Sequence, residues 1–428
     1  MLDRKFILEN VAAIKQNCAN RGVTADIDLF VDQETQRLEK LKEVETLNRR
    51  ANEVSKSMGK AKDDAEREAR KEEGRQLRAQ KDAAQSEHDS LQASIAELQL
   101  VIPNMSHPDV PVGVNDKANL EVRRGTTEVP TFDFTPLDHV DLGIQLDLID
   151  LEGGARTSGH GFYFLRNEAV LLDLALQQFI ITKLMENGFT PTVTPDLAQD
   201  SILEGIGFNP RGPETQVYSI EGSNLSLVGT AEITLGGLYA GVTVDADQLP
   251  IKLCGISHCF RTEAGAHGRA TRGIYRVHQF TKVEMFAFTL PEQSDEVHQQ
   301  LCDIECEIFN ELGVPFRVVD TATGDLGGPA YRKYDLEAWM PGRGDGGSWG
   351  EITSTSNCTD YQSRRLKTKC KRKGEKGTQF VHTLNGTAVA TGRAMIAILE
   401  NNQQANGSVM VPAVLQKWVG KERIGPKR

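Results

Sequence analysis

A chain of 428 residues is too long for one hydrophobic core, so its length predicts two or three domains. Hydrophobic residues make up 39% and charged residues 25%, as in an ordinary soluble protein, and no apolar run reaches the roughly 18 residues that span a bilayer. The net charge of −11 disfavours nucleic acid as a general partner but leaves room for a local basic surface. We therefore expect a globular protein without a membrane partner.

The cysteines and the start of the chain indicate the compartment. The N-terminus lacks the apolar segment of a secretory signal, which favours a cytoplasmic location. Seven cysteines, odd in number and irregularly spaced, favour free thiols in a reducing compartment. Cys254, His258 and Cys259, or Cys302 and Cys306, lack the usual spacing of zinc ligands, so buried cysteines are expected instead.

The first hundred residues predict helices. Residues 3–20 form one expected helix, and residues 28–99 are rich in Glu, Lys, Arg, Ala and Gln with almost no proline. Apolar residues recur in heptads on both sides of a charged stretch bracketed by Gly59 and Gly74, namely Leu41, Val44, Leu47, Ala51, Val54, Met58 and then Leu77, Ala84, Leu91, Ile95, Leu98. The pattern predicts an antiparallel coiled-coil hairpin, with a turn between the glycines and arms of about 45 Å. By pattern alone, such a hairpin is more often a dimerisation or scaffold element than an RNA contact.

A second domain follows a stretch rich in proline and glycine. We take residues 104–130 as a linker and begin the second domain at residue 131. Helices are expected over 167–187, 292–312 and 387–402. Strands are expected near 192–195, 225–234, 251–262, 273–288, 317–320, 334–339, 349–357 and 378–384. This order predicts an α+β fold built on an antiparallel sheet flanked by helices.

Charged residues occupy an unusual place in this domain. Two apolar-rich strands are joined by a polar turn over residues 264–272, and Arg261, Glu263, Arg276 and Glu284 lie on or beside the strands. Charge on a strand is normally confined to a solvated face. Two arginines and two carboxylates at the ends of strands that flank a flexible turn predict a site for a ligand that carries both charges.

A phosphate would have to be bound by side chains. Neither the P-loop nor the glycine-rich dinucleotide turn occurs in the sequence. Arginine suits this task, because its planar guanidinium binds two oxygens at once. The candidates are Arg261, Arg276 and Arg393, the last of which follows a run of small residues from Gly386 to Gly392. A single one of these arginines is more often a surface ion pair, but three on core segments favour a site.

Glu351 and Ser354 are candidate ligands for Mg²⁺, which prefers a carboxylate or two together with oxygens of ATP. On a regular strand these two side chains point to opposite faces, so they can share a metal only if the strand bulges. An exposed Glu351 without a ligand is the alternative.

A basic segment lies between Arg364 and Lys376, where eight Lys and Arg residues accompany one acid, Glu375. A solvated hairpin and an RNA-binding surface are equally open for this segment.

Several short sequences occur in a recognisable order. These are Ile102-Pro103-Asn104, Ser158 to Leu165, Pro195 after a long helix, Gly229-Thr230-Ala231-Glu232, Phe260-Arg261-Thr262-Glu263 with Gly273 to Phe280, Glu351 to Asp360, and Gly386 to Arg393. In them the chain resembles, along essentially its full length, the seryl-tRNA synthetase family of class II aminoacyl-tRNA synthetases. Motif 1 would span about 170–197, motif 2 about 254–288 and motif 3 about 385–403. Thr353, Thr355 and Thr387 stand where the family often has Ser, Cys and Ser.

The resemblance implies a catalytic set of Arg261, Arg276 and Arg393. It implies an ATP site of Arg261, Thr262, Glu263, Arg276, Val277, Phe280, Glu351, Ile352, Thr353, Ser354 and Arg393, with Mg²⁺ bound by Glu351 and Ser354. It implies an L-serine site of Thr230, Ala231, Glu232, Arg261, Glu284, Asn385 and Thr387. Arg261 would bridge the serine carboxylate and the α-phosphate, so catalysis would rest on positioning and charge neutralisation without a protein nucleophile.

The resemblance also implies an organisation and partners. Residues 1–103 would form a tRNA-binding domain whose hairpin spans about 28–99, and residues 131–428 the catalytic domain. L-serine and ATP would give seryl-adenylate and pyrophosphate, and serine would then pass to the 3′ end of tRNA(Ser), and of tRNA(Sec) where that tRNA exists. A homodimer is expected through motif 1. The motif 2 turn, with Arg269 and Arg272, is expected to order on ATP and to meet the acceptor end of the tRNA.

Two alternatives belong to other classes of protein. A related ligase that loads an amino acid onto a carrier protein would lack the arm over residues 28–99. A degenerate relative that only binds RNA or protein would have lost Arg261, Glu284 or Arg393, and all three are present.

Overall fold

The computed structural model describes residues 1–209, 216–263 and 272–426. Within these ranges, no helix combines the length and the apolar character needed to cross a membrane. The predicted motif 2 turn, including Arg269, lies outside the described residues apart from Arg272.

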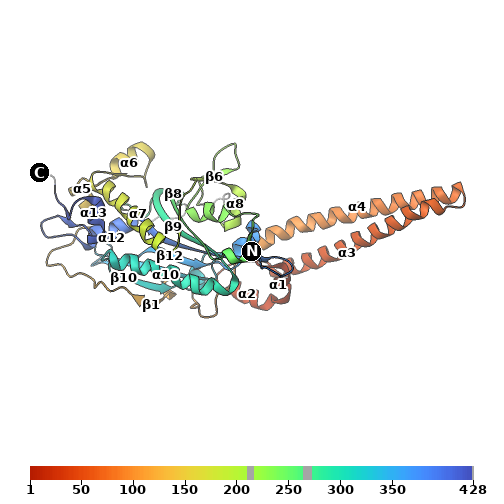
Figure 1. Ribbon diagram of the computed structural model, residues 1–428, viewed down its shortest axis with the longest axis horizontal. Helices are drawn as coiled ribbons and strands as arrows, with labels where there is room; N and C mark the ends of the chain where they lie inside the picture. Colours follow the sequence, from red (N-terminus) through yellow and green to blue (C-terminus); the bar gives the residue numbers. More distant parts are fainter. Residues whose placement is uncertain (210–215, 264–271, 427–428) are drawn as a thin grey trace. The chain divides into compact units, whose positions relative to one another are not determined.

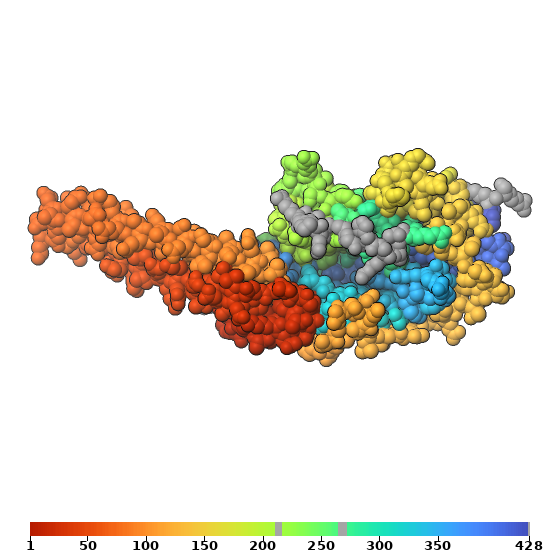
Figure 2. Space-filling view, turned by 180° about the vertical axis from the view of Figure 1, so that it is seen from behind, coloured from red at the N-terminus to blue at the C-terminus, as the bar shows by residue number. Residues whose placement is uncertain are grey.

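The chain divides into two compact units, Met1–Pro103 and Asn104–Arg428. The first unit consists of α1 (Arg4–Glu9), α2 (Val11–Asn20), α3 (Ile27–Ser57), the 3-10 turn η1 (Met58–Lys60) and α4 (Asp64–Val101). Helices α3 and α4 form the antiparallel hairpin that the heptads predict, and they lie side by side along their length (Figures 1 and 2). The single helix expected over residues 3–20 is instead two helices, because the backbone leaves the helical conformation at Asn10.

The seam of the hairpin contains the heptad positions. Those with the most complete burial are Leu77, Ala84 and Ile95. The polar interruption at His88 contacts the opposite helix, where Arg37 Nη1 lies 3.2 Å from His88 Nε2. An ion pair between Lys40 and Glu87 (2.7 Å) lies beside it. The two helices are therefore held in one register by both apolar and polar contacts.

The hairpin turns over residues 58–63. Asp63 begins α4 by accepting a hydrogen bond from the Glu66 N–H (2.7 Å). The prediction that the turn extends to Gly74 is wrong, because Gly74 lies inside α4. A glycine in a helix interior costs only about 1 kcal/mol relative to alanine, which the packing of a long hairpin exceeds.

The second unit is an α+β domain, as expected. Its helices are α5 (His139–Gln145), α6 (Leu151–Ser158), α7 (Glu168–Glu186), α8 (Asp200–Ile206), α9 (Ala231–Gly237), α10 (Ser294–Glu311), α11 (Tyr361–Leu366), α12 (Thr391–Asn401) and α13 (Ala413–Val419). Its strands are β1 (Leu120–Arg124), β2 (Ile149–Asp150), β3 (Phe164–Leu165), β4 (Thr190–Val193), β5 (Leu197–Gln199), β6 (Leu225–Leu227), β7 (Thr243–Asp245), β8 (Ile251–Phe260), β9 (Gln279–Thr289), β10 (Phe316–Asp320), β11 (Arg332–Met340), β12 (Ser348–Asn357), β13 (Lys369–Lys371), β14 (Gln379–Phe380), β15 (His382–Ala390), β16 (Val409–Met410) and β17 (Arg423–Ile424).

The main sheet has eight strands in the order β1-β10-β11-β12-β15-β9-β8-β4. All neighbours are antiparallel except β4 and β8, which are parallel. The sheet is therefore mixed rather than purely antiparallel. One face is covered by α7, α10 and α12, and α8 and α9 lie over part of the other (Figure 1).

The predicted linker over residues 104–130 contains a strand of the sheet. β1 pairs antiparallel with β10 at one edge, with Leu120 opposite Asp320 and Arg124 opposite Arg317. Every residue of β1 is exposed, so its sequence lacks the alternation of apolar and polar residues that marks a half-buried strand.

Other boundaries also differ from the sequence prediction, and the strand expected over 273–288 begins only at Gln279. The strand expected over 225–234 ends at Leu227, because Thr230 caps α9 with its side chain, which accepts from the Glu232 N–H (3.2 Å). The helix expected over 387–402 begins only at Thr391, because the residues before it continue β15. Thr387 is therefore a strand residue.

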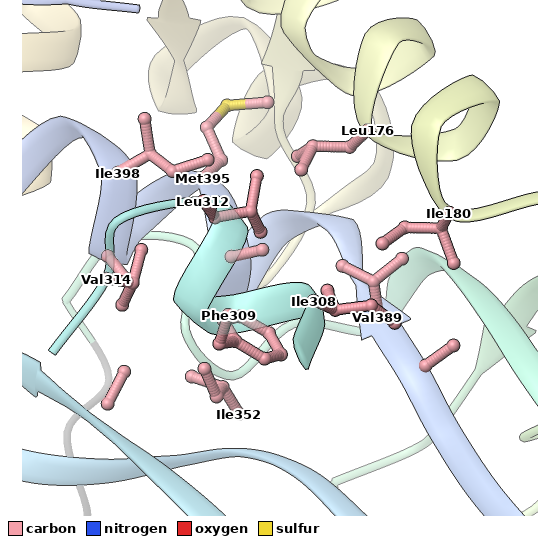
Figure 3. Packing of buried hydrophobic residues seen from close by; sticks show 14 of the residues in the cluster. Leu176, Ile180, Ile308, Phe309, Leu312, Val314, Ile352, Val389, Met395 and Ile398 are labelled. Carbon is pink, nitrogen blue, oxygen red and sulfur yellow. The ribbon is translucent and has the colours of Figure 1, made fainter. Parts of the chain in front are cut away.

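The core lies between the sheet and the helices on its covered face. It includes Leu176 and Ile180 of α7, Phe309 of α10, Val389 of β15 and Met395 of α12 (Figure 3). These side chains are shielded from water, and their burial is the main favourable term that holds the helices on the sheet. The strands are thereby fixed in register, which positions the side chains on the opposite face.

Candidate active site

Side chains of β9 alternate between the core and a cavity. Val283 and Met285 belong to the core under the helices, so Phe280, Lys282 and Glu284 point to the opposite face, where they line the cavity. Two charges on a buried strand are costly unless they are paired. Here Lys282 Nζ lies 2.5 Å from Glu284 Oε2.

A bulge in β12 brings the two candidate metal ligands together. The register against β11 shifts between Glu351 and Thr353, so Ile352 is an extra residue in β12. Ile352 joins the core, and Thr353 Oγ1 donates to Glu305 of α10 (2.9 Å). Glu351 and Ser354 therefore both line the cavity. The condition that the sequence analysis set for a shared metal is met.

The cavity has a volume of about 190 Å³. It is lined by Phe208, Thr230, Glu232, Arg261, Glu263, Ile274, Tyr275, Arg276, Val277, Phe280, Lys282, Glu284, Glu351, Ile352, Thr353, Ser354, Asn385, Thr387, Ala390, Gly392 and Arg393. Of the predicted site residues, only Thr262 and Ala231 do not line it. Ala231 instead packs against Gly255 of β8, where the Cβ of any other residue would come within 2.8 Å of the Ala231 Cβ.

Two of the three predicted arginines have fixed partners. Arg393 Nη1 donates to the Glu351 carbonyl (3.0 Å), and its guanidinium lies 4.6 Å from the centre of the Tyr275 ring. Arg276 forms an ion pair with Glu263 (3.2 Å). Glu263 has a positive φ of 51°, a conformation that a non-glycine residue adopts at a cost and that often marks a functional site.

Arg261 is held more loosely at its charged end. Its guanidinium contacts the Gly229 carbonyl at 3.4 Å and lies 5.3 Å from the centre of the Phe280 ring. Its backbone N–H donates to the His278 carbonyl (3.0 Å), which fixes the main chain. In the described part of the chain, the guanidinium forms no ion pair with a carboxylate. Its charge is available to an anionic ligand.

Lys282, Glu284 and Thr387 form a buried polar cluster in the lining of the cavity. Thr387 Oγ1 donates to Glu284 Oε2 (3.2 Å), and Lys282 Nζ donates to Thr387 Oγ1 (3.3 Å). β9 and β15 hold the cluster because Glu284 is directly opposite Thr387 in their register. A carboxylate beside a hydroxyl can bind an ammonium group and a small alcohol.

Glu232 lies beside this cluster in the first turn of α9. Its Oε1 accepts from Gln362 Nε2 (2.7 Å) and Asn385 Nδ2 (3.0 Å). Burial, together with the nearby charge of Glu284, raises the pKa of Glu232 to about 7. An ammonium ligand in the cavity would oppose both effects.

Replacing Glu232 with glutamine should stabilise the protein more at pH 8 than at pH 5. Below pH 4.5 the Glu232 carboxyl is protonated in both the folded and the unfolded protein. Its contribution to the stability of the folded protein is lost as the pH rises through the folded-state pKa of about 7. A pKa difference of one unit corresponds to about 1.4 kcal/mol, and water that reaches Glu232 through the cavity reduces the effect. We therefore expect the free energy of unfolding of E232Q, relative to wild type, to be about 2 kcal/mol higher at pH 8 than at pH 5. Thermal melting of E232Q and wild type at both pH values measures it.

The matched control for E232Q is Glu204→Gln, because Glu204 is an exposed residue of α8. Its melting temperature relative to wild type should not change with pH. An equal difference between E232Q and wild type at pH 5 and pH 8 would contradict the assigned state of Glu232.

The donors at the β12 bulge suit magnesium. Burial opposes the charge of Glu351, but Arg393 and Lys333 outweigh it and hold the pKa of Glu351 below its usual value. In the described ranges no group of three or more His, Cys, Asp or Glu residues could hold a metal by itself. One carboxylate and the Ser354 hydroxyl fit a cation that takes its other ligands from phosphate oxygens and water.

Several lining residues were not predicted from the sequence, of which Lys282 is the most important. The alternation of side chains along a strand predicts its position, because Lys282 lies two residues from both Phe280 and Glu284 and so shares their face of β9. Tyr275 was also missed; its hydroxyl donates to the Glu351 carbonyl (2.8 Å). Phe208 enters from a distant segment, and no local pattern places it at the cavity.

The site combines two kinds of binding region. Arg261, Arg276 and Arg393 bring positive charge to the lining, and Glu232 and Glu284 bring carboxylates to it. Such a site can neutralise a phosphate and hold a small ammonium-bearing ligand beside it.

Two family models match the chain. Residues 217–402 match the tRNA synthetase class II core domain (G, H, P, S and T), and residues 1–106 match the seryl-tRNA synthetase N-terminal domain. These matches, which cover most of the mixed sheet and of its cavity lining, place the chain among the class II aminoacyl-tRNA synthetases, a class of aminoacyl-tRNA ligases.

Comparison with known proteins identifies the family within this class. The serine–tRNA ligase of Rhodopirellula baltica is 63% identical over 420 residues, 98% of each chain. That of Rubrobacter xylanophilus is 53% identical over 428 residues, 100% of each chain. The crystal structure of seryl-tRNA synthetase from Pyrococcus horikoshii complexed with ATP matches with a TM-score of 0.94 and 37% identity, over 100% of both chains. The chain belongs to the seryl-tRNA synthetase family, which confirms the resemblance seen in the motifs.

Proposed function

We propose that the protein activates L-serine with ATP to seryl-adenylate and pyrophosphate, and then transfers serine to the 3′ end of tRNA(Ser). The observation that carries this proposal is one cavity that joins Arg261 to the Lys282–Glu284–Thr387 cluster. The cluster suits the ammonium and hydroxyl of serine, and the arginines suit phosphates.

Arg261 bridges the serine carboxylate and the α-phosphate in this proposal. Both groups are anionic, and their repulsion opposes the attack of one on the other. A guanidinium between them lowers that repulsion and fixes the geometry, which are the main contributions a protein makes to such a transfer. Its place in the cavity lining, with a guanidinium that contacts the Phe280 ring and pairs with no carboxylate in the described structure, supports the role.

The nucleotide would occupy the half of the cavity lined by Glu263, Phe280 and Arg393. The adenine ring would lie between Phe280 and the Arg393 guanidinium, with its amino group on Glu263, and Arg276 would bind the outer phosphates. Glu351 and Ser354 would hold Mg²⁺, which supplies positive charge to the phosphates when bound. Their shared face after the β12 bulge supports this assignment.

The serine ammonium would bind between Thr230, Glu232 and Glu284, and its hydroxyl would bind Glu284 and Thr387. A site that pairs buried polar groups with a hydroxyl rejects an analogue without it, by roughly 10⁴-fold. Asn385 would act on serine through Glu232, to which its amide donates (3.0 Å).

The α3–α4 hairpin is proposed to bind tRNA(Ser) by shape and backbone rather than by base sequence. We further propose that tRNA(Sec) is a second substrate and that the protein is cytoplasmic. Charging of a tRNA(Sec) transcript with serine tests the second substrate.

A homodimer through motif 1 is also proposed. Its support is apolar surface on α7 and on the edge strand β4: Leu174 is 56%, Met185 55% and Val193 81% exposed. Surface of this kind marks an interface. Sedimentation, which would give twice the 47.2 kDa mass of the chain, tests it.

The decisive assay is amino-acid-dependent exchange of pyrophosphate into ATP. Serine should support exchange, and alanine at the same concentration should support roughly 10⁴-fold less. Exchange needs no tRNA, so the result is independent of the arm. Absence of exchange with every amino acid would overturn the enzymatic proposal.

A further inference from the structure

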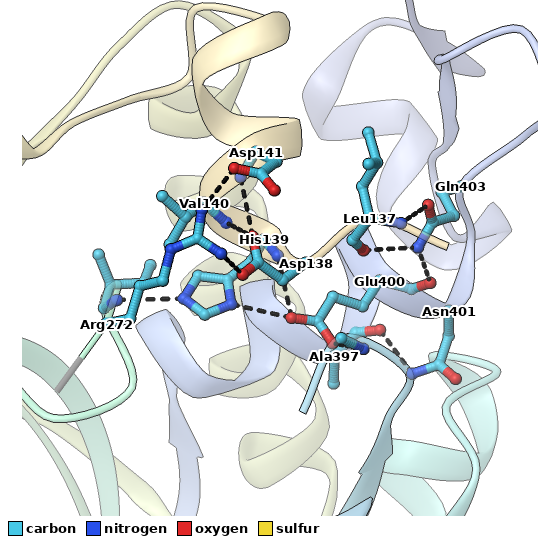
Figure 4. A network of polar contacts seen from close by, with 12 residues as sticks. Leu137, Asp138, His139, Val140, Asp141, Arg272, Ala397, Glu400, Asn401 and Gln403 are labelled. Atoms are coloured by element: carbon cyan, nitrogen blue, oxygen red, sulfur yellow. Dashed lines mark hydrogen bonds and ion pairs between the residues drawn. The ribbon is translucent and has the colours of Figure 1, made fainter. Parts of the chain in front are cut away.

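Residues 274–277 line the cavity where the nucleotide is proposed to bind, but they belong to no strand or helix. They are held from outside the cavity by His139, the first residue of α5 (Figure 4). The Ile274 N–H donates to His139 Nε2 (3.2 Å). Gly273, with a φ of 87°, leaves room for the ring, since the Cβ of any other residue there would lie 1.9 Å from Nε2.

The other nitrogen of the ring is bound to Glu400 of α12. His139 Nδ1 lies 2.8 Å from Glu400 Oε1. Because Nε2 accepts a hydrogen bond from a backbone N–H, the ring proton lies on Nδ1, and the imidazole is neutral. Glu400 also accepts from the His139 N–H (3.0 Å) and the Gly342 N–H (2.8 Å). The carboxylate is 1% exposed and is satisfied by these three donors.

Neighbouring contacts tie the same segments together. Gln403, just beyond α12, accepts from the Leu137 N–H (2.8 Å) and donates to the Leu137 carbonyl (2.9 Å). Arg272 forms ion pairs with Asp138 and Asp141 (Figure 4). The segment that begins α5 is thus fixed to α12, and His139 projects from it toward Ile274.

We infer that His139 is a positioning residue for the nucleotide half of the site, an inference that rests on the proposed function. It does not line the cavity, but it fixes the backbone that presents Tyr275 and Arg276. Tyr275 packs under Arg393 and donates to the Glu351 carbonyl, so a shift of this backbone displaces the proposed adenine and phosphate contacts together.

The serine half has separate support. Lys282, Glu284 and Thr387 lie on β9 and β15, whose mutual register holds them, and none contacts His139 in the described structure. Loss of the His139 contact should therefore weaken ATP binding and leave serine binding largely unchanged. A general loss of folding would affect both.

Two substitutions separate the two ring contacts. In His139→Gln, the side-chain carbonyl reaches about as far as Nε2 and can accept from the Ile274 N–H. In His139→Asn, the shorter amide can donate to Glu400 but cannot reach Ile274. In serine-dependent exchange, we expect H139N to raise the KM for ATP by about 10-fold with the KM for serine within about twofold. H139Q should restore the KM for ATP to within about threefold of wild type.

The matched control is His382→Asn, because His382 is likewise a hydrogen-bonded histidine outside the cavity lining; it is half-buried and bound to Ser294 (2.9 Å). Both of its KM values should match wild type. Equal KM values for ATP in H139N and H139Q, or an equal rise in both substrates' KM in H139N, would overturn the inference.

A second variant tests the inference if H139N does not fold. Glu400→Gln loosens the ring without changing His139, and it should raise the KM for ATP but not that for serine; an unchanged KM for ATP would overturn the inference. Exchange by the wild type tests the proposed function itself, so the two can fail separately.

Discussion

Replacing Arg261 with alanine should lower serine-dependent pyrophosphate exchange at least about 10³-fold. Loss of one preorganised donor to a developing charge typically costs 10²- to 10³-fold, and Arg261 is proposed to serve two anionic groups. Because its guanidinium forms no ion pair in the described structure, its removal leaves no buried carboxylate unpaired. The expected effect is therefore on catalysis rather than on stability.

Arg261→Lys distinguishes charge from geometry. Lysine keeps the charge but lacks the planar fork that binds two oxygens at once, so we expect a loss of about 10²-fold. Arg124→Ala is the control, because Arg124 lies on the exposed edge strand β1, paired with Glu121 (2.6 Å). Melting temperatures should stay close to wild type throughout. Exchange by R261A within tenfold of wild type would contradict the proposed bridge.

Shortening the arm should lower tRNA charging at least about 100-fold and leave exchange intact. The pairs Arg37–His88 and Lys40–Glu87 show the register of the hairpin. Removal of residues 45–81, with a short Gly-Ser turn in their place, therefore keeps the lower half. If the distal arm holds tRNA, loss of two or three charge-assisted contacts lowers kcat/KM for tRNA at least about 100-fold.

Both reactions are measured on the same shortened protein. Exchange within twofold of wild type shows that the second unit is intact, and charging of tRNA(Ser) then reports on the arm alone. A variant that charges tRNA(Ser) as fast as wild type would show that the distal arm has no part in tRNA binding.

Local periodicity predicted the elements that depend on one segment. The heptads from Leu41 to Leu98 predicted the hairpin, since the seam of a coiled coil consists of apolar residues that repeat at heptad spacing within one segment of the chain. Gly74 lies inside α4 rather than at the turn, because the cost of a glycine in a helix is small beside the packing of a long hairpin. The Asp63 cap was the better signal.

Elements that depend on distant partners were predicted less well. β1 is exposed at every residue and exists because β10 offers it hydrogen bonds. Thr387 was placed in a helix, but pairing with β9 keeps it in a strand opposite Glu284. Small residues around it fit either structure, so the sequence alone could not decide.

The motifs predicted most of the lining of the cavity, because family motifs mark residues on several segments at once. They did not reveal Lys282, which lies inside motif 2 between recognised positions. They did not reveal His139 either. Its role depends on contacts with Ile274 and Glu400, which are 135 and 261 residues away in sequence.

Because of the bulge at Ile352, the proposed metal site depends on the number of residues between the paired positions of β11 and β12, and not only on which residues these are. Point substitutions along β12 leave Glu351 and Ser354 on one side of the sheet as long as the extra residue is kept. Inserting one residue between Leu336 and Glu337 of β11 would give Ile352 a partner and restore the regular pleat, which turns Glu351 and Ser354 to opposite faces while every candidate ligand is retained. A comparison of ligand residues alone would judge such an insertion variant competent, although the changed pairing of β12 would have separated the two ligands.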